Sequence, residues 1–77
     1  KEIISVEAKM TNWKGAFMQA QLNENFASHS YVLLPKEVIN KNVVSSFKCK
    51  IGLISKENNR IVFKKKAKKA KLPGSYF

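Results

Sequence analysis

The order of segments in the first half of the chain constrains the fold more than any other feature. Residues 3–10 are rich in Ile and Val, as strands are, whereas residues 12–27 begin with a good N-cap type and continue with helix formers. Residues 30–34 form a short apolar run that Pro35 stops, as it would stop a buried strand. Strand, helix and strand in this order predict a βαβ unit with parallel strands and a right-handed crossover.

The side chains of the first predicted strand sort into two faces by the two-residue period of a strand. One face is wholly apolar and consists of Ile4, Val6, Ala8 and Met10. The other face is mixed and consists of Ile3, Ser5, Glu7 and Lys9. A strand of this composition is expected to be covered on both faces or to end in a cleft.

The predicted helix carries two apolar faces when its residues are projected at about 100° each. The first face consists of Trp13, Ala16, Phe17, Ala20 and Ala27. The second lies nearly opposite and consists of Met18, Leu22 and Phe26. A helix on a sheet needs only one such face, so we expect the second to contact another segment or another chain.

The second half of the chain predicts a short helix and a hairpin. Residues 35–47 begin with Pro, which suits a first helical position, and apolar residues recur there at helical spacing. Two apolar runs, 50–55 and 60–66, flank a polar turn at 56–59 and predict a β-hairpin.

These elements predict a single small α/β domain over residues 1–77: a βαβ unit followed by a short helix and a β-hairpin. The core is expected over about 3–65, and the basic stretch 64–77 is expected to be a loose tail. A chain of this length buries only about 60% of its unfolded surface, so its core is marginal.

Composition favours an anionic partner. Lys and Arg number 15 against five acids, a formal net charge of +10, which is typical of proteins that bind nucleic acid. All five acids are Glu, and the chain has no Asp. The single cysteine, Cys49, cannot form an internal disulfide, so a reducing, cytoplasmic setting is expected. No apolar run approaches the roughly 18 residues that span a bilayer, so no membrane partner is expected.

Glu7 and Lys9 are the residues most suited to chemistry. Two residues apart on a strand, they are expected to project from the same face. A carboxylate can hold Mg²⁺ through oxygen, and a lysine beside it can stabilise negative charge on a phosphoryl group or position an attacking water. The backbone carbonyl of Ala8, between them, could supply a further oxygen ligand.

The first strand and helix, ISVEAKMTNWKGAFMQAQ, followed by YVLLP and KIGLIS, resemble the second half of the PD-(D/E)XK nuclease superfamily, which has the restriction-endonuclease-like fold. The resemblance implies that Glu7 and Lys9 are the acidic and lysine members of the catalytic motif and that Ala8 contributes a metal-ligating carbonyl. It places Gln19 near the edge of the active site. It also implies Mg²⁺ or Mn²⁺ as cofactor and DNA, more than RNA, as substrate.

The chain departs from this family at one essential position. The first acidic residue of the family, normally an Asp on an earlier strand, has no counterpart here. Either another segment or chain supplies it, or the domain is inactive, so whether the chain is an enzyme stays open. Phosphate affinity is expected from exposed lysines: Lys14, Lys64, Lys65, Lys66, Lys68 and Lys69.

Two alternatives from other functional classes remain. Residues 31–42 with 60–66 are loosely similar to the swapped-hairpin transcription regulators, which would make the chain a non-catalytic DNA-binding module. That architecture is an all-antiparallel dimeric barrel, so parallel pairing of 3–10 with 30–34 would contradict it. The other alternative is an interaction protein that uses the second apolar face of the helix.

Overall fold

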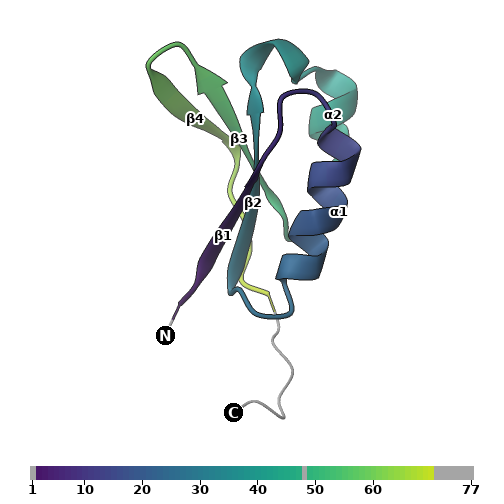
Figure 1. The fold of residues 1–77 in the computed structure, drawn as a ribbon, viewed down its shortest axis with the longest axis vertical. Coiled ribbons are helices and arrows are strands. Elements are labelled where there is room, and N and C mark those ends of the chain that lie inside the picture. The colour runs from purple at the N-terminus through teal and green to yellow at the C-terminus, as the bar shows by residue number, and fades with distance from the viewer. Residues whose placement is uncertain (1, 48, 71–77) are drawn as a thin grey trace.

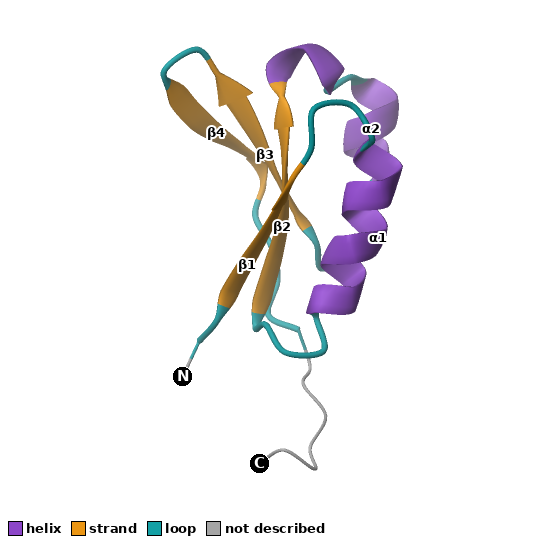
Figure 2. Cartoon of the chain, viewed as in Figure 1, coloured by secondary structure: helices purple, strands orange, loops and turns teal. Residues whose placement is uncertain are grey.

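A mixed four-stranded sheet with helices on one face makes up the fold (Figures 1 and 2). A computed structural model describes residues 2–47 and 49–70. The elements, in chain order, are β1 (Ile4–Ala8), α1 (Trp13–Asn23), β2 (His29–Pro35), a 3-10 turn (Lys36–Val38), α2 (Lys41–Ser46), β3 (Gly52–Glu57) and β4 (Arg60–Lys65). None of the helices in the described part of the chain is long and apolar enough to cross a bilayer.

The sheet contains the predicted βαβ unit and the predicted hairpin. Its strand order is β1-β2-β3-β4. β1 pairs with β2 in parallel, β2 pairs with β3 in parallel, and β3 pairs with β4 antiparallel. The parallel pairing of β1 with β2 confirms the α/β prediction and contradicts the all-antiparallel barrel of the swapped-hairpin regulators.

Both predicted helices differ from the prediction in their extent. α1 ends at Asn23 instead of 27, because the N–H groups of Asn25 and Phe26 donate to carbonyls three residues back and tighten the chain into a turn. The single helix predicted over 35–47 is a 3-10 turn followed by α2. Asn40 separates the two, since its extended backbone and its side chain, which accepts from the Val43 N–H at 3.0 Å, begin a new helix.

The start of the basic tail is docked, contrary to the prediction that it is loose. The Lys68 N–H donates to the Lys50 carbonyl at 2.9 Å, and the Ala70 N–H donates to the Ser28 carbonyl at 2.7 Å. Ser28 is itself buried and bonds to Ile3 in both directions, through its hydroxyl and its N–H. Residues 71–77, the remainder of the predicted tail, lie outside the described residues.

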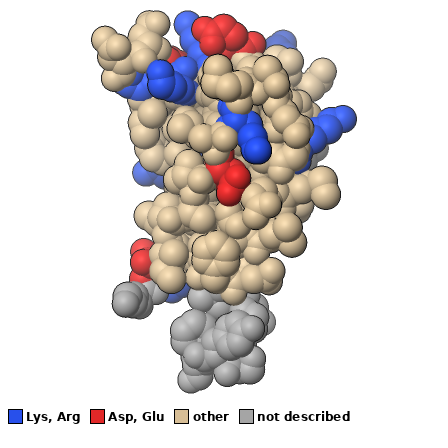
Figure 3. Space-filling view, in the orientation of Figure 1, with Lys and Arg blue, Asp and Glu red and all other residues tan. Residues whose placement is uncertain are grey.

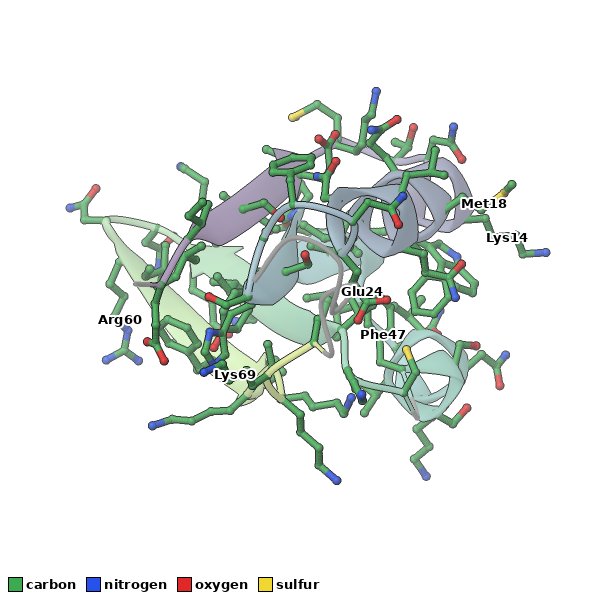
Figure 4. The ribbon with its side chains drawn as sticks, turned by 90° about the horizontal axis from the view of Figure 1, so that it is seen from below. Lys14, Met18, Glu24, Phe47, Arg60 and Lys69 are labelled. Atoms are coloured by element: carbon green, nitrogen blue, oxygen red, sulfur yellow. The ribbon has the colours of Figure 1, made fainter. Side chains whose placement is uncertain are left out.

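The core lies between the two helices and the sheet. Small residues, Ala16 and Ala20, are fully buried on α1 and allow its backbone to approach the sheet closely. Phe47, at the end of α2, is 2% exposed and packs edge-on against Phe17 of α1, with ring centroids 4.9 Å apart. Figure 4 shows Phe47 between the two helices.

The second apolar face of α1, which was expected to contact another segment or another chain, is exposed in the described structure. Met18, Leu22 and Phe26 are 65%, 60% and 57% exposed. In Figure 4, Met18 and Lys14 point away from the sheet. No other described segment packs over this face, so its expected partner remains a prediction.

The two faces of β1 are arranged differently from what their polarity suggests. The mixed face lies under α1, where the Ser5 hydroxyl donates to the Ser30 hydroxyl at 3.0 Å. The apolar face is exposed: Ile4 is 63% and Val6 48% accessible. Hydrogen bonding among the polar groups under α1 permits this inversion, since a buried polar group that finds a partner costs little. We call the sheet surface that lacks a helix the open face.

Replacement of Phe47 by Ala should lower the free energy of unfolding by about 3–5 kcal/mol, because it removes the aromatic contacts that join α2 to α1. Urea denaturation followed by circular dichroism measures this decrease. Val44→Ala, at a site that is 41% exposed on the same helix, is the matched control and should cost less than about 1 kcal/mol. Equal stability of the two variants would contradict the central position of Phe47 in the core.

Candidate functional site

Glu7 lies near the end of β1, on the face of the sheet that α1 covers. Its partner in β2 is Val32, which is fully buried in the core. The Glu7 side chain is half-buried, and its Oε1 accepts a hydrogen bond of 3.4 Å from Nδ2 of Asn23, the last residue of α1. The carboxylate with the predicted catalytic role therefore lies between β1 and the helix that follows it.

Asn23 connects Glu7 to Gln19. Its Oδ1 accepts a hydrogen bond of 3.2 Å from Gln19 Nε2, while its Nδ2 donates to Glu7. Asn23 is only 7% exposed, and a buried amide that uses both its acceptor and its donor has a fixed orientation. The structure thus brings Glu7 and Gln19 into one hydrogen-bonded chain, although the two side chains are bridged and do not bond directly.

Lys9 lies one residue beyond β1 and does not pair with Glu7. Of the described residues, only Lys64 and Glu57 form an ion pair within 4.0 Å. The Lys9 N–H continues the ladder by donating to the Leu33 carbonyl at 3.2 Å, and its side chain is exposed. Figure 3 shows an acidic patch beside a basic patch over β1 and α1, surrounded by uncharged surface.

Lys9 also lines a small cavity where β1 and β2 end. The cavity has a volume of about 150 Å³ and is mostly apolar. We call it the strand-end cavity, and its lining consists of Ala8, Lys9, Met10, Leu33, Leu34, Pro35 and Lys56. Two exposed lysines, Lys9 and Lys56, are therefore among the residues that line an apolar cavity.

The backbone N–H and C=O groups of successive β1 residues point alternately toward β2 and toward the free edge of the sheet. The Ile3 carbonyl accepts from the His29 N–H at 3.1 Å, and the Lys9 N–H donates to Leu33. Groups that bond to a parallel neighbour recur at every second residue, so the N–H and C=O groups of Ile4, Val6 and Ala8 point away from β2. The Ala8 carbonyl, the predicted metal ligand, therefore faces the outer edge of the sheet.

Glu7 and Ala8 offer the type of ligand that a divalent cation prefers, but two ligands are too few to hold it. Both offer oxygen, which Mg²⁺ prefers, yet Mg²⁺ requires near-octahedral coordination. Within residues 2–47 and 49–70, no three His, Cys, Asp or Glu side chains group so that they could hold a metal ion together. A complete site would need further ligands from a substrate, another segment or another chain.

The lysines predicted to bind nucleic acid lie in different environments. Lys14 is exposed on α1, with its Nζ 5.7 Å from the centroid of the Trp13 ring. Lys66, Lys68 and Lys69 are exposed on the segment after β4, which runs to the end of the sheet where β1 and β2 begin. Glu7 and Lys9 lie where β1 ends, so the basic tail and the predicted catalytic pair occupy opposite ends of the sheet.

Lys65 differs from the neighbouring lysines because its ammonium group donates hydrogen bonds to backbone carbonyls. It donates to the carbonyls of Cys49 and Ile51, the latter at 2.9 Å. Partial burial lowers the pKa of Lys65 below its ordinary value. Its described contacts therefore join β4 to the chain that precedes β3, and its predicted role toward phosphate would compete with them.

An open groove of about 630 Å³ lies between α2 and the β3–β4 hairpin. Three lysines line it, Lys36, Lys41 and Lys64, together with Ile39, Asn40, Val44, Ser45, Ser55 and Glu57. We call it the α2 groove. Glu57 is the acidic residue of this lining, and hydrogen bonds from Ser55 (3.0 Å) and Lys64 (3.3 Å) lower the pKa of its carboxyl group.

Several polar residues of these arrangements were absent from the sequence-based candidates, among them Asn23, Lys36 and Lys41. The signal for Asn23 was its spacing, since it follows Gln19 by four residues and so lies on the same side of α1. The two lysines carried no such signal, because the α2 groove forms only when the chain after β2 folds back against the hairpin.

Comparisons with protein-family models, with curated proteins and with solved structures found no match for this chain. The likeness to the PD-(D/E)XK superfamily therefore depends on the short motifs around Glu7, Lys9 and Gln19. Any function assigned to the chain depends on the geometry of its own residues.

Replacing Glu57 by Gln should make the stability of the fold fall less steeply as the pH is lowered toward 3. Because the folded-state pKa of Glu57 lies below its ordinary value of 4.5, its ionised form stabilises the fold above that pH, and the contribution disappears as the pH falls through the lowered pKa. Thermal melts between pH 6 and pH 3 measure the slope. Glu2→Gln, at an exposed position, is the control and should keep the wild-type slope; an unchanged slope in Glu57→Gln would contradict the assignment.

Proposed function

We propose that the chain is the core half of a metal-dependent nuclease that hydrolyses phosphodiester bonds in nucleic acid, with DNA favoured over RNA as the substrate. The observation that carries the proposal is the hydrogen-bonded chain Glu7–Asn23–Gln19 within a parallel βαβ unit. It joins Glu7, the acidic residue of the motif formed by Glu7, Ala8 and Lys9, to Gln19 of the next helix, and the resemblance assigns these two positions to a shared site. The sequence patterns did not predict that the buried Asn23 amide would link the Glu7 and Gln19 side chains.

In the proposed site, Glu7 supplies a carboxylate oxygen and Ala8 a carbonyl oxygen to Mg²⁺ or Mn²⁺. The cation, when bound, would polarise the phosphoryl oxygen and make a bound water more acidic. Asn23 holds Glu7 in position, and Gln19 orients Asn23. Lys9, which is exposed at the end of β1, would stabilise the negative charge that develops on the scissile phosphate or position the attacking water.

The proposed site is incomplete in the isolated chain. One carboxylate and one carbonyl leave most of the coordination sphere of a divalent cation unfilled, and the acid missing from the sequence would be the next ligand. We therefore propose that a further segment or another chain completes both the fold and the site. By itself the chain should bind nucleic acid and cleave it poorly.

The net charge of +10 supports a nucleic-acid partner, and the arrangement of lysines suggests where it would bind. Lys9 and Lys36 directly follow the parallel strands β1 and β2, and Lys56 is the last residue but one of β3. All three lie at the carboxyl ends of these strands, where ligands of open α/β sheets commonly bind. Lys41 and Lys64 extend this basic region along the α2 groove.

A non-catalytic nucleic-acid-binding module is the second candidate. The α2 groove favours it, because three lysines around one groove can bind phosphates without any metal ligand. Its antiparallel, barrel-like form is contradicted by the parallel sheet, but the binding function itself does not depend on that form. Binding with no cleavage in any partner-completed state would support this candidate over the nuclease.

Cleavage of duplex DNA in Mg²⁺ or Mn²⁺ tests the nuclease proposal, on the isolated chain and on the complete protein or complex that contains it. We expect Glu7→Ala and Lys9→Ala each to reduce cleavage by the complete form by about 100-fold or more, because each removes charge stabilisation in the transition state. Glu2→Ala and Lys50→Ala, both at exposed positions, are the matched controls. Wild-type cleavage in the Glu7 and Lys9 variants would remove the catalytic claim.

Salt dependence of binding tests the basic surfaces separately. Replacing Lys36 and Lys41 by Ala should weaken binding to duplexes of unrelated sequence to the same extent. It should also reduce the slope of the logarithm of the binding constant against the logarithm of the salt concentration, by roughly 0.9 for each phosphate that the variant no longer neutralises. The triple variant of Lys66, Lys68 and Lys69 reports the basic tail in the same assay. A slope unchanged in both variants would show that neither surface binds phosphate.

A further inference from the structure

Two aromatic rings lie on the open face of the sheet and meet across β3. Tyr31 of β2 pairs with Val6 of β1, which lies on the open face, and with Gly52 of β3. Phe63 of β4 pairs with Ile54, two residues beyond Gly52 and therefore on the same face. The two rings meet edge-to-face, with centroids 5.4 Å apart and planes at 84°. Phe63 is 48% exposed and Tyr31 is half-buried, so the aromatic pair is open to a ligand.

Gly52 makes room for this aromatic pair and for the basic segment that follows β4. A Cβ atom at Gly52 would collide with the Tyr31 ring and would lie 2.7 Å from the backbone nitrogen of Ala67. That Cβ would point to the open face, so the segment around Ala67 crosses the open face beside Tyr31. Lys66 and Lys68, on either side of Ala67, are both exposed.

Lysines border the aromatic pair at two ends of the open face. At one end is the basic segment, in which the two lysines that flank Ala67 are followed by Lys69, also exposed. At the other end is Lys56, an exposed residue of β3 four positions after Gly52, hence on the same face and about 13 Å away along the strand. Figure 4 shows Lys69 on the side of the molecule away from Met18 of α1.

Neither of the two acidic residues in the strands lies on the open face. Glu7 accepts a hydrogen bond from Asn23 of α1, and Glu57 lines the α2 groove on the helix side of the sheet. The open face thus combines exposed aromatic and aliphatic side chains with positive charge that no strand carboxylate offsets. A ligand that carries both flat apolar groups and negative charges is complementary to this combination.

We propose that the open face binds single-stranded nucleic acid, with bases stacked on Phe63 and Tyr31 and with phosphates at Lys56 and the basic segment. Four-stranded sheets with aromatic rings on an uncovered face stack about two or three bases in this way. A single strand is favoured over a duplex because the bases of a duplex stack on one another and cannot lie on a protein ring. The site is on the opposite face of the sheet from Glu7, so it does not rest on the nuclease proposal.

A protein partner matches the open face less well. A second copy of this chain would bring lysines against lysines and would add its own charge of +10. An uncharged apolar partner would cover the two rings but would leave the lysines at both ends without a counter-charge. A single strand supplies bases and phosphates together, at alternating positions along one chain.

Fluorescence anisotropy with labelled oligonucleotides of about eight nucleotides tests the proposal on the full chain. The probes are oligothymidylate, oligouridylate and a duplex of mixed sequence, each measured in the presence of a metal chelator. Phe63→Leu removes the ring but keeps an apolar side chain. We expect it to weaken binding of both single strands by about tenfold and to change duplex binding by less than about twofold.

Two further variants serve as controls in the same assay. Phe63→Trp keeps a ring and should retain single-strand binding within about threefold. Met18→Ala removes an exposed apolar side chain from α1, on the other side of the molecule, and should leave single-strand binding unchanged. Replacing Lys56 by Ala should reduce the salt dependence of single-strand binding, with a slope lower by roughly 0.7 for each phosphate that is no longer neutralised.

NMR titration of the unmodified chain with oligothymidylate tests the site without any substitution. The ring-proton signals of Tyr31 and Phe63 should move upfield because a stacked base shields them, whereas the methyl signals of Met18 and Leu22 should not move. Unchanged single-strand binding by Phe63→Leu, an equal loss of duplex binding, or a response at Met18 in place of the rings would overturn the proposal. So would self-association of the chain that covers the two rings. None of these readouts depends on metal or cleavage, so a failure here is distinct from a failure of the nuclease proposal.

Discussion

The close contact between α1 and the sheet is the constraint on which the rest of the structure depends. Because Ala16 and Ala20 have small side chains, the helix approaches β1 and β2 closely enough for Asn23 to reach Glu7. The same contact positions Phe17 against Phe47, which holds α2 in place. With bulkier residues at the two alanines, the helix would stand further from the sheet, and neither the core nor the polar chain could form as it does.

Local patterns in the sequence predicted the order and type of the elements, because strand and helix periods depend only on neighbouring residues. They predicted α1 too long, since the turn after Asn23 arises from hydrogen bonds three residues back that composition does not encode. For β1 they predicted cover on both faces or an end in a cleft, and they did not indicate which face the helix would cover. Which face a helix covers depends on partners such as Ser30, far along the chain, and this could not be inferred from β1 alone.

The sequence likewise predicted some parts of the candidate site and not others. Glu7 and Gln19 were predicted from a short motif, and the fold does bring them into one hydrogen-bonded chain through Asn23. Glu7 does not pair with Lys9: the Glu7 carboxylate accepts from Asn23 at the end of α1, whereas the Lys9 side chain is exposed just beyond the end of β1. The α2 groove combines lysines from three separate elements, and only the tertiary fold makes them neighbours.

Ser28 has a consequence for how the molecule opens. Its carbonyl accepts a hydrogen bond from the Ala70 N–H, and its hydroxyl both donates to and accepts from the Ile3 backbone. The first and last described segments therefore both bond to one residue that lies between α1 and β2. Fraying of either segment removes a support of the other. The two ends of the described chain should therefore detach as a single cooperative unit, distinct from the β3–β4 hairpin, whose contacts are local in sequence and can persist without them.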